Sequence, residues 1–391
     1  MDKEYLTNPL NRRKKKYKYY LRKLENFFKK ILIYTTLFPI SLPFLIKNYL
    51  FKNLYFFRDF TNQNGVVFLV FILKYSNKCK FLINVKDFDR VLNRFGIVFL
   101  LNNFSLNFGY KKFKKISFED KKSDIFLNSD YFSYFDKPVE SSNNNFVLPF
   151  YLPKNFYLRN KFQKLKNNNN RKKFKIIFSG SIHNEWYGNL NFLNKENARF
   201  LNRTEIMDIL KDNFSDKIVI IKNQSELDKI ESSNKEIVIL ETNPAISLRK
   251  KNFTEDQHLN LISDSKFFLC MPGTSMPLCY HLIESCMVGT IPILSYNDFL
   301  YPKFKDDEAI FFSKKNELIN AINVALNIDE SNYLIMQNKI SNYYDKHLNP
   351  KNIGTKFQNK DYPLEVFINM DHISTKKREE RIPEMKKKLI P

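Results

Sequence analysis

The chain contains few of the residues that staple small folds or turn the backbone sharply. Its 391 residues include eight glycines and four cysteines, namely Cys79, Cys270, Cys279 and Cys286. Four widely spaced thiols exclude a disulfide-stapled scaffold, and the absence of any C-x-x-C pair removes the usual signature of a structural zinc site. Because glycine is so scarce, Gly180, Gly273 and Gly289 are expected where the backbone needs a special angle or a close approach.

The apolar stretch near the N-terminus is too short to cross a membrane as a helix. Residues 31–46 form a run of sixteen uncharged side chains, which would span about 24 Å as a helix, against about 30 Å of bilayer hydrocarbon. Pro39 and Pro43 interrupt the stretch further. The thirty residues before it carry eleven basic and three acidic side chains. We therefore expect a basic arm at residues 1–60, with residues 1–58 meeting anionic headgroups while the apolar part dips into one leaflet.

Two other interpretations of this arm stay open. It is also consistent with a basic tail that leads into a buried core helix, or with a signal anchor that places the rest of the chain in a secretory lumen. No small-residue cleavage site follows, and the basic leader is long for a secretory signal. The interpretation that we favour predicts a cytoplasmic protein that lies peripherally at the membrane.

The net charge of +23 is informative only where it clusters. Lys, Asn, Ile, Phe and Tyr are abundant together, which is typical of coding bias, so part of the charge is incidental. No signature of a nucleic-acid-binding fold accompanies it, and we expect no nucleic-acid partner. An apolar fraction of 43% excludes disorder for most of the chain, and the length favours two domains.

Short apolar runs alternate with helix-length segments, which predicts an α/β protein with parallel sheets covered on both faces. In the first half, strands are expected at 66–75, 80–85 and 97–101, with weaker candidates at 125–127 and 146–151. A basic, asparagine-rich stretch is typical of a linker. The resulting organisation is an arm at 1–60, an acceptor-side α/β domain at 61–163, a linker at 164–173, a Rossmann-like domain at 174–345 and a tail at 346–391.

The pattern is sharper after the linker. Strands are expected at 175–181, 218–221, 236–240, 267–271 and 291–294. Asn202 with Glu205, and Thr254 with Gln257, have the spacing of capping boxes that open helices. A further helix at 277–288 is expected to end at Gly289. This β-α-β succession predicts a doubly wound sheet.

The most specific segment is residues 265–294, in which a buried strand leads through a Pro-Gly-Thr-Ser loop into a helix. Exposed N–H groups at a helix N-terminus accept phosphate, and ligands of such sheets lie at the carboxyl ends of the strands. On the helix, His281 and Glu284 are three residues apart and share a face. Glu284 is thus a candidate acceptor for a ribose diol. The loop residues in question are Pro272, Gly273, Thr274 and Ser275.

This segment resembles the sugar-nucleotide-binding half of exostosin-like glycosyltransferases, which have a GT-B fold of two Rossmann-like domains facing a cleft. The resemblance rests on the run Ser265, Phe267, Leu269, Pro272 or Gly273, Glu284, Gly289 and Pro292. The chain departs from the family at His281, where members usually have an arginine. Arg249 and Lys250 are candidates to take over the neutralisation of a diphosphate. The resemblance covers residues 240–315 best and does not extend before the linker.

A second candidate region follows the first strand of this domain. In a GT-B arrangement Gly180 and Ser181 would approach the diphosphate, while His183 or Glu185 would touch the acceptor and are candidates for catalysis. A plain surface loop is the alternative. Arg203 opens the next helix and is a candidate phosphate contact. No catalytic base is identified.

Two further patterns leave alternatives open. Asp87 and Asp89 have the Asp-x-Asp spacing by which one-domain glycosyltransferases hold a divalent cation, but they directly precede a helix and suit a capping role better. The segment from Pro363 onwards resembles the opening strand and helix of lipooligosaccharide-type glycosyltransferases. It is either a tail that packs back on the domains or a fragment of a second catalytic module.

The resemblance thus implies a glycosyltransferase that needs no cofactor or metal and uses a nucleoside-diphosphate sugar as donor. Its acceptor would be a glycan or lipid-linked molecule, as in the synthesis of cell-surface polysaccharide or glycoconjugates. The alternatives are a metal-dependent transferase that uses Asp87 and Asp89, and a non-enzymatic basic module that binds membranes or nucleic acid.

Overall fold

The computed structural model of the chain separates into two compact units, residues 1–54 and 55–391, and the elements below belong to the second from Tyr55 onwards. The residues described are 54–57, 64–76, 80–83, 87–95, 103–106, 114–133, 143–163, 172–182, 199–230, 235–241, 254–274, 276–370 and 373–380. Nearly all of the predicted arm, most of the linker and the strand expected at 97–101 lie outside them.

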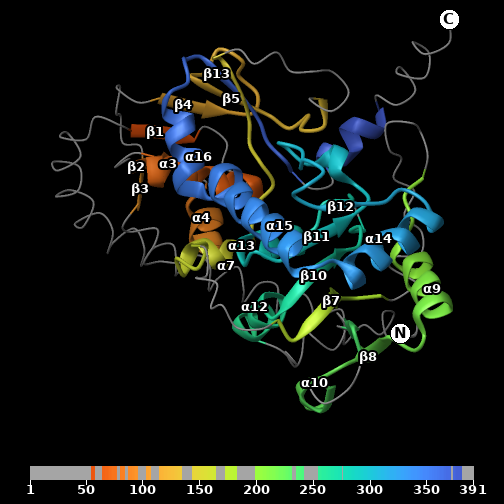
Figure 1. Ribbon diagram of the computed structural model, residues 1–391. Helices are drawn as coiled ribbons and strands as arrows, with labels where there is room; N and C mark the ends of the chain where they lie inside the picture. Colours follow the sequence, from red (N-terminus) through yellow and green to blue (C-terminus); the bar gives the residue numbers. More distant parts are fainter. Residues whose placement is uncertain are drawn as a thin grey trace, which may run out of the picture. The chain divides into compact units, whose positions relative to one another are not determined.

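The first sheet has the strand order β3-β2-β1-β4-β5-β13-β6 (Figure 1). Pairing is parallel from β1 through to β6 and between β2 and β3. The first five strands follow the doubly wound order, in which the chain moves to one side of β1 and then to the other. Their bounds are β1 Leu54–Phe57, β2 Lys80–Ile83, β3 Phe104–Leu106, β4 Lys114–Ser117, β5 Ile125–Asn128, β6 Asn145–Val147 and β13 Leu364–Phe367.

One strand predicted for this sheet is wrong. Residues 66–75 lie in the helix α3, Asn64–Ser76, instead. The side chains from Val66 to Leu73 are at most 1% exposed, and α16, Pro350–Gln358, packs along the helix. A helix that is covered on every side is apolar all round, so its sequence has no helical period and cannot be distinguished from a buried strand by pattern.

The C-terminal segment returns to the first sheet. Strand β13 lies between β5 and β6, where Val366 pairs with Leu127 on one side and Phe146 on the other. The sequence predicts this segment as part of a C-terminal tail at 346–391, outside the two domains. Parallel pairing on both edges makes it an inner strand of the sheet instead. A helix at 373–380 follows it, and Ser374 Oγ in that helix donates to the carbonyl oxygen of Ser129 at 2.8 Å.

The second sheet is also parallel, in the order β12-β11-β10-β7-β9-β8. All five strands expected after the linker are confirmed with small shifts of their ends. The strands lie at β7 Phe174–Gly180, β8 Ile218–Ile221, β9 Ile237–Glu241, β10 Ser265–Cys270, β11 Ile291–Leu294 and β12 Ile310–Phe311.

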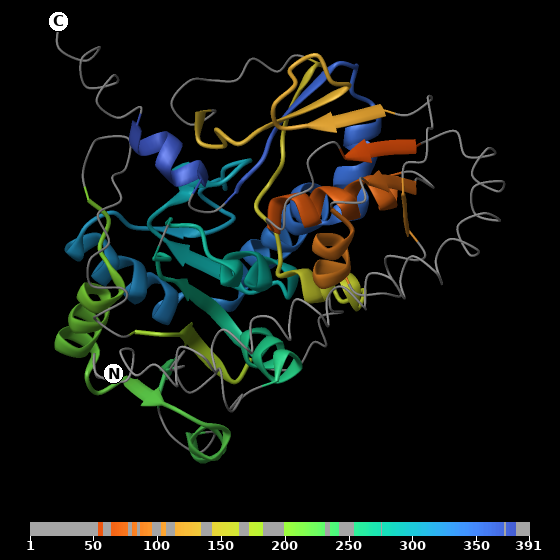
Figure 2. The ribbon, with the colours of Figure 1, turned by 180° about the vertical axis from the view of Figure 1, so that it is seen from behind.

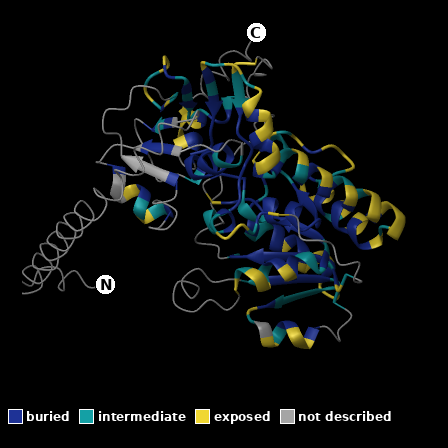
Figure 3. Cartoon of the chain, turned by 90° about the vertical axis from the view of Figure 1, so that its left-hand side faces the viewer, coloured by how far each residue is buried: buried dark blue, intermediate teal, exposed yellow. Residues whose placement is uncertain are grey.

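Helices cover both faces of this sheet. On one face α14 packs against α9 and β7, and on the other α12 and α13 pack against β10 and against each other, with α15 beside α13 (Figures 1 and 2). The strands between the two layers are mostly buried (Figure 3). The helices are α9 Arg203–Phe214, α12 Glu255–Ser263, α13 Tyr280–Met287, α14 Lys315–Asn327 and α15 Glu330–Tyr343.

The predicted helix boundaries are set by local hydrogen bonds. Asn202 and Glu205 form a complete capping box at the start of α9, and Thr254 and Gln257 form another at the start of α12. Gly289 follows α13 with a φ of 71°, the left-handed conformation that ends a helix most easily at glycine. Each of these predictions is confirmed.

The fold class predicted from the sequence, an α/β protein of the GT-B kind with two Rossmann-like sheets, is confirmed by the two parallel sheets and their helical layers. None of the helices in the described ranges combines the length and hydropathy that crossing a bilayer requires.

Candidate functional site

The second sheet reverses its direction of winding between β7 and β10. From β7 the chain continues to β8 and β9 on one side, and from β10 it continues to β11 and β12 on the other. The connections that leave the carboxyl ends of these two neighbouring strands therefore diverge, which is where doubly wound sheets bind their ligands. At these carboxyl ends lie Gly180, the last residue of β7, with Ser181 after it, and the segment from Met271 to Thr274 after β10.

A buried arginine ties these two segments together. Arg203, the first residue of α9, is 3% exposed. Its Nε donates to the carbonyl oxygen of Pro272 at 2.7 Å, and its Nη1 donates to that of Ser181 at 2.7 Å. Its Nη2 lies 3.3 Å from Cys279 Sγ, and the guanidinium carbon is 5.4 Å from the ring centre of Phe178. Each nitrogen of the side chain is thus engaged within the protein, and the arginine fixes the spacing of the two segments.

Two glycines occupy positions in these segments that leave no room for a side chain. A Cβ atom at Gly180 would lie 2.8 Å from Phe178 Cζ, and one at Gly273 would lie 2.6 Å from the carbonyl oxygen of Met276. The expectation that Gly180 and Gly273 occupy tight positions is confirmed. The N–H of Gly273 donates to the carbonyl oxygen of Pro277 at 3.1 Å, so this amide is used inside the loop.

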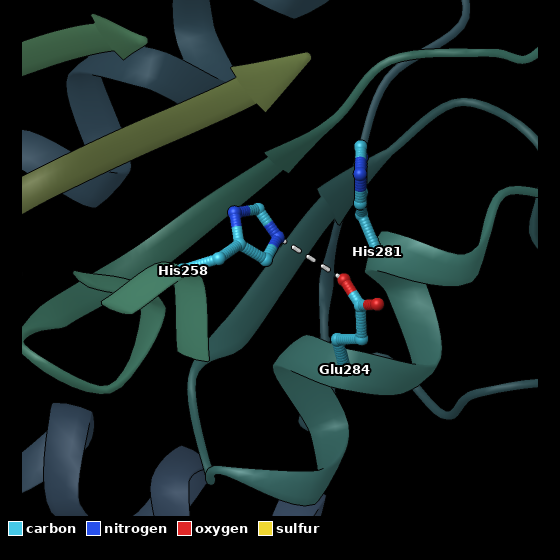
Figure 4. A group of neighbouring side chains, drawn as sticks. All are labelled: His258, His281 and Glu284. Carbon is cyan, nitrogen blue, oxygen red and sulfur yellow. Dashed lines mark hydrogen bonds and ion pairs between the residues drawn. The ribbon is translucent and has the colours of Figure 1, made fainter. Parts of the chain in front are cut away.

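Four polar side chains meet beside these segments, and we refer to Ser179, His258, His281 and Glu284 as the switch-point cluster. Figure 4 shows His258 reaching from α12 towards Glu284 on α13. The distance from His258 Nε2 to Glu284 Oε2 is 3.2 Å, and His258 Nδ1 lies 3.1 Å from Ser179 Oγ at the end of β7. The cluster therefore joins three elements by a chain of hydrogen bonds.

The carboxylate of the switch-point cluster is buried yet ionised. Burial of Glu284, which is 5% exposed, would by itself raise its pKa, but the hydrogen bond from His258 and the electrostatic interaction with the two histidines outweigh this and lower it. Oε2 accepts from His258, whereas Oε1 has no hydrogen-bond partner among the described residues. A carboxylate accepts several hydrogen bonds, so this oxygen retains capacity for a ligand.

The second histidine of the cluster is held neutral. Burial lowers the pKa of His281 to about 4, with Glu284 opposing the shift and the charges of His258 and Arg203 adding to it. Within the described part of the chain, neither ring nitrogen of His281 has a hydrogen-bond partner. At neutral pH its imidazole thus offers one N–H donor and one lone pair rather than a positive charge.

Side chains from the part of the chain that forms the first sheet and its helices, which we call the first-sheet half, contact the start of α13. The ring of Tyr280 stacks on that of Phe150 at 5.7 Å between centres, and its hydroxyl oxygen accepts a hydrogen bond from Asn64. Asn369 Nδ2, just after β13, lies 3.4 Å from Met276 Sδ. The loop after β10 is thus supported by residues that follow β13 as well as by its own helix.

Of the remaining site residues predicted from the sequence, some belong to the described part of the chain and others do not. Pro272 is buried and Thr274 is exposed, so the loop presents one end to solvent. Five predicted site residues lie outside the described residues: His183, Glu185, Arg249, Lys250 and Ser275.

Asp87 directly precedes α4, Phe88–Phe95. Its side chain is fully buried, and its Oδ1 forms an ion pair with Arg90 Nη1 at 3.1 Å. Asp87 is thus paired with a residue in the first turn of its own helix. Nothing is described of the side chain of Asp89.

Two residues of the switch-point cluster were not identified from the sequence. His258 lies 26 residues before Glu284 and within a helix that local pattern predicts only as amphipathic. Ser179 is an unremarkable residue of a buried strand. The one signal that could have singled out His258 is that histidine is rare in this chain, which has five. Rarity alone does not show which residue a histidine contacts.

No family of known proteins matches the chain, and no curated protein matches it in sequence. Among solved structures it is similar to Anabaena Alr3699/HepE in complex with UDP, at 10% identity and a TM-score of 0.38, over 86% of this chain and 100% of that one. It is also similar to WaaG, a glycosyltransferase involved in lipopolysaccharide biosynthesis, at 8% identity and a TM-score of 0.36, over 77% and 98%.

A third similar structure is the trehalose-6-phosphate synthase OtsA, at 12% identity and a TM-score of 0.30; the match covers 53% of this chain and spans less than half, 45%, of that one. Such likenesses concern the course of the backbone alone and identify no ligand or activity. The class that the fold and site define is an α/β protein with two parallel sheets and a polar site at the switch point of the second.

Proposed function

We propose that this chain is a glycosyltransferase of the GT-B kind, which transfers a sugar from a nucleoside-diphosphate sugar to a glycan or lipid-linked acceptor. The observation that carries the proposal is the switch-point cluster: an ionised carboxylate and two imidazoles lie beside the connections that leave β7 and β10. This is the position at which doubly wound sheets bind nucleotides. The sequence resemblance of residues 265–294 to exostosin-like transferases supports the same assignment.

In this proposal Glu284 binds the ribose of the donor. Its Oε2 is held by His258, while Oε1 is available to accept hydrogen bonds from the ribose hydroxyls. Because His258 is itself bonded to Ser179, the carboxylate is fixed before the ligand arrives. Preorganisation of this kind reduces the cost of ordering side chains on binding.

The diphosphate would lie nearer the loop after β10. The exposed end of that loop at Thr274 and the N–H of the neutral His281 are the proposed hydrogen-bond donors. Arg203 is assigned a positioning role, because its donors hold Ser181 and Pro272. Arg249, Lys250, Gly180 and Ser275 remain proposed neighbours of the diphosphate.

Transfer would depend on stabilising the negative charge that develops on the departing diphosphate. Backbone N–H groups, the imidazole of His281 and nearby basic side chains suit this role, and the proposal requires no metal ion. The acceptor would reach the site from the first-sheet half, with His183 and Glu185 as candidate contacts. The basic arm at residues 1–58 would keep a cytoplasmic enzyme beside membrane-bound acceptors.

The direct test is binding of nucleoside diphosphates to the full chain, by calorimetry with UDP, GDP, ADP and CDP. Replacing Glu284→Gln removes a charge-assisted hydrogen bond to ribose, worth about 1.5–3 kcal/mol. The expected loss of affinity for the preferred nucleotide is about 10- to 150-fold. Release of the same nucleoside diphosphate from its sugar conjugates would then show turnover.

A matched control is Glu236→Gln, at the amino end of β9, whereas the switch-point cluster lies near the carboxyl ends of β7 and β10. Glu236 precedes β9 and pairs with Lys175 and Lys217, so this variant should bind nucleotide as the parent does. The proposal is wrong if no nucleoside diphosphate binds, or if the two variants weaken binding equally.

A further inference from the structure

Three of the four side chains in the switch-point cluster also have the chemistry of metal ligands. One ligand atom each from His258, His281 and Glu284 lies within 4.8 Å of the other two. We propose that these three residues form a binding site for a zinc-class divalent ion, and that the ion competes with the nucleoside for Glu284. The competition rests on the proposed function, whereas the metal site stands on the geometry of the cluster alone.

The distances suit a small tetrahedral ion. Zinc binds imidazole nitrogen and carboxylate oxygen at about 2.0–2.2 Å, which places two ligand atoms about 3.3–3.5 Å apart. His258 Nε2 and Glu284 Oε2 are already 3.2 Å apart. The third ligand atom, on His281, needs a movement on the order of 1 Å, which rotation of a side chain on the first turn of α13 provides.

The ligand types select the ion. Two imidazoles and one carboxylate match zinc and its first-row neighbours, whereas magnesium and calcium prefer sites made of oxygen ligands. Two histidines and one glutamate also form the three-ligand set of zinc sites that keep a fourth position open. The side chain of His258 is 19% exposed, so an ion can reach the cluster from solvent and water can take that position.

Ser179 provides the outer hydrogen bond that metal-binding histidines usually have. In the metal-free cluster, His258 Nε2 lies 3.2 Å from Glu284 Oε2, and Nδ1 lies 3.1 Å from Ser179 Oγ. When an ion takes the lone pair at Nε2, the proton of the imidazole is on Nδ1 and Ser179 Oγ accepts it. A serine hydroxyl both donates and accepts, so Ser179 can orient the ring with and without the ion.

The ion and the ribose require the same carboxylate. A zinc ion bound at Oε2 draws charge from the same carboxylate whose Oε1 the proposed function gives to the ribose hydroxyls, so Oε1 becomes a weaker hydrogen-bond acceptor. Bound zinc is therefore expected to inhibit donor binding, and a nucleoside diphosphate is expected to weaken zinc binding by the same factor.

The test uses the full chain freed of metal with a chelator and then dialysed. Zn²⁺ is titrated alone by calorimetry, Co²⁺ is titrated by visible absorption, and Mg²⁺ serves as the control ion. We expect Zn²⁺ to bind, Mg²⁺ not to bind, and the cobalt spectrum to show tetrahedral nitrogen and oxygen ligands. A thiolate-to-cobalt band would assign the ion to a cysteine and would overturn the site.

Four variants locate the ion. His281→Asn and Glu284→Gln each remove a ligand, and Ser179→Ala removes the outer hydrogen bond, which typically costs about 10- to 100-fold in affinity. His347→Asn changes a half-buried histidine outside the cluster and should leave zinc affinity unchanged. Affinity that survives both ligand variants overturns the proposal.

Competition between zinc and a nucleoside diphosphate is measured separately from zinc binding itself. Zinc binding that is unaffected by a bound nucleoside diphosphate overturns the shared carboxylate. If no nucleoside diphosphate binds at all, the proposed function fails and the competition with it, while the titrations of Zn²⁺ and Co²⁺ still decide whether the site exists.

Discussion

Replacing the buried guanidinium of Arg203 tests whether one side chain sets the geometry of the site. In Arg203→Met the apolar stem is largely kept, but two charge-assisted hydrogen bonds to the carbonyl oxygens of Ser181 and Pro272 are lost. Each such bond contributes about 1.5–3 kcal/mol. The contact with Cys279 Sγ is weaker, because sulfur is a poor hydrogen-bond acceptor. We expect the free energy of unfolding to fall by about 3–6 kcal/mol, a large part of the usual stability of a domain.

The matched control is Arg199→Met, four residues earlier in the chain. Arg199 pairs with Glu205, but both side chains are partly exposed, at 42% and 34%. Pairs of this kind contribute at most about 1 kcal/mol. The capping box between Asn202 and Glu205 does not depend on Arg199, so the start of α9 is kept in the control.

Urea unfolding followed by far-UV circular dichroism measures both variants. Arg203→Lys is an intermediate case. The compact ammonium group of lysine can reach one of the two carbonyl oxygens but not both, so about half of the lost unfolding free energy should be recovered. If Arg203→Met is as stable as Arg199→Met, the guanidinium does not hold the two segments. Nucleotide affinity should follow the same ranking, because the segments after β7 and β10 lose their fixed spacing.

Two further predictions concern the backbone and acid. Gly289→Ala places a side chain at a φ of 71° and should cost about 1–2 kcal/mol of unfolding free energy, whereas Gly289→Asn should cost less, because asparagine tolerates that conformation. His281 and His347 both have a pKa of about 4 in the fold, lowered chiefly by burial from an ordinary 6.5. The unfolded chain therefore takes up their protons first, and stability should fall as pH decreases from about 6.5 to about 4, by at most about 1.4 kcal/mol per pH unit for each histidine. The slope should flatten in His281→Asn; a slope that is unchanged in both His281→Asn and His347→Asn would refute this origin.

Part of the candidate site could be predicted because its signals are local. The strand, loop and helix of residues 265–294 follow one another in the chain, so the position of Glu284 one turn beyond His281 was readable from spacing. The tight positions of Gly180 and Gly273 were also predicted, since glycine is scarce in this chain and each follows an apolar strand. What the spacing did not show is that Glu284 already has a partner.

That partner comes from a different helix. His258 and Glu284 are 26 residues apart and meet because α12 and α13 pack on the same face of the sheet. Arg203 presents the same difficulty: its place at the start of α9 was predicted, but the carbonyls it binds lie 22 and 69 residues away. Contacts of this kind depend on strand order, which the local pattern of residues does not reveal.

By itself, the sequence determined the features that are decided within a few residues: the two capping boxes, the glycine that ends α13, and the parallel strands of the second sheet. Only the tertiary structure decided that the apolar run at 66–75 is a helix. The run is apolar on every side, and it forms a helix whose surface is covered partly by α16. It also decided that residues 364–367 belong inside the first sheet. Burial of a strand or helix depends on what packs against it, and in both cases the packing partner lies hundreds of residues away or at the other end of the chain.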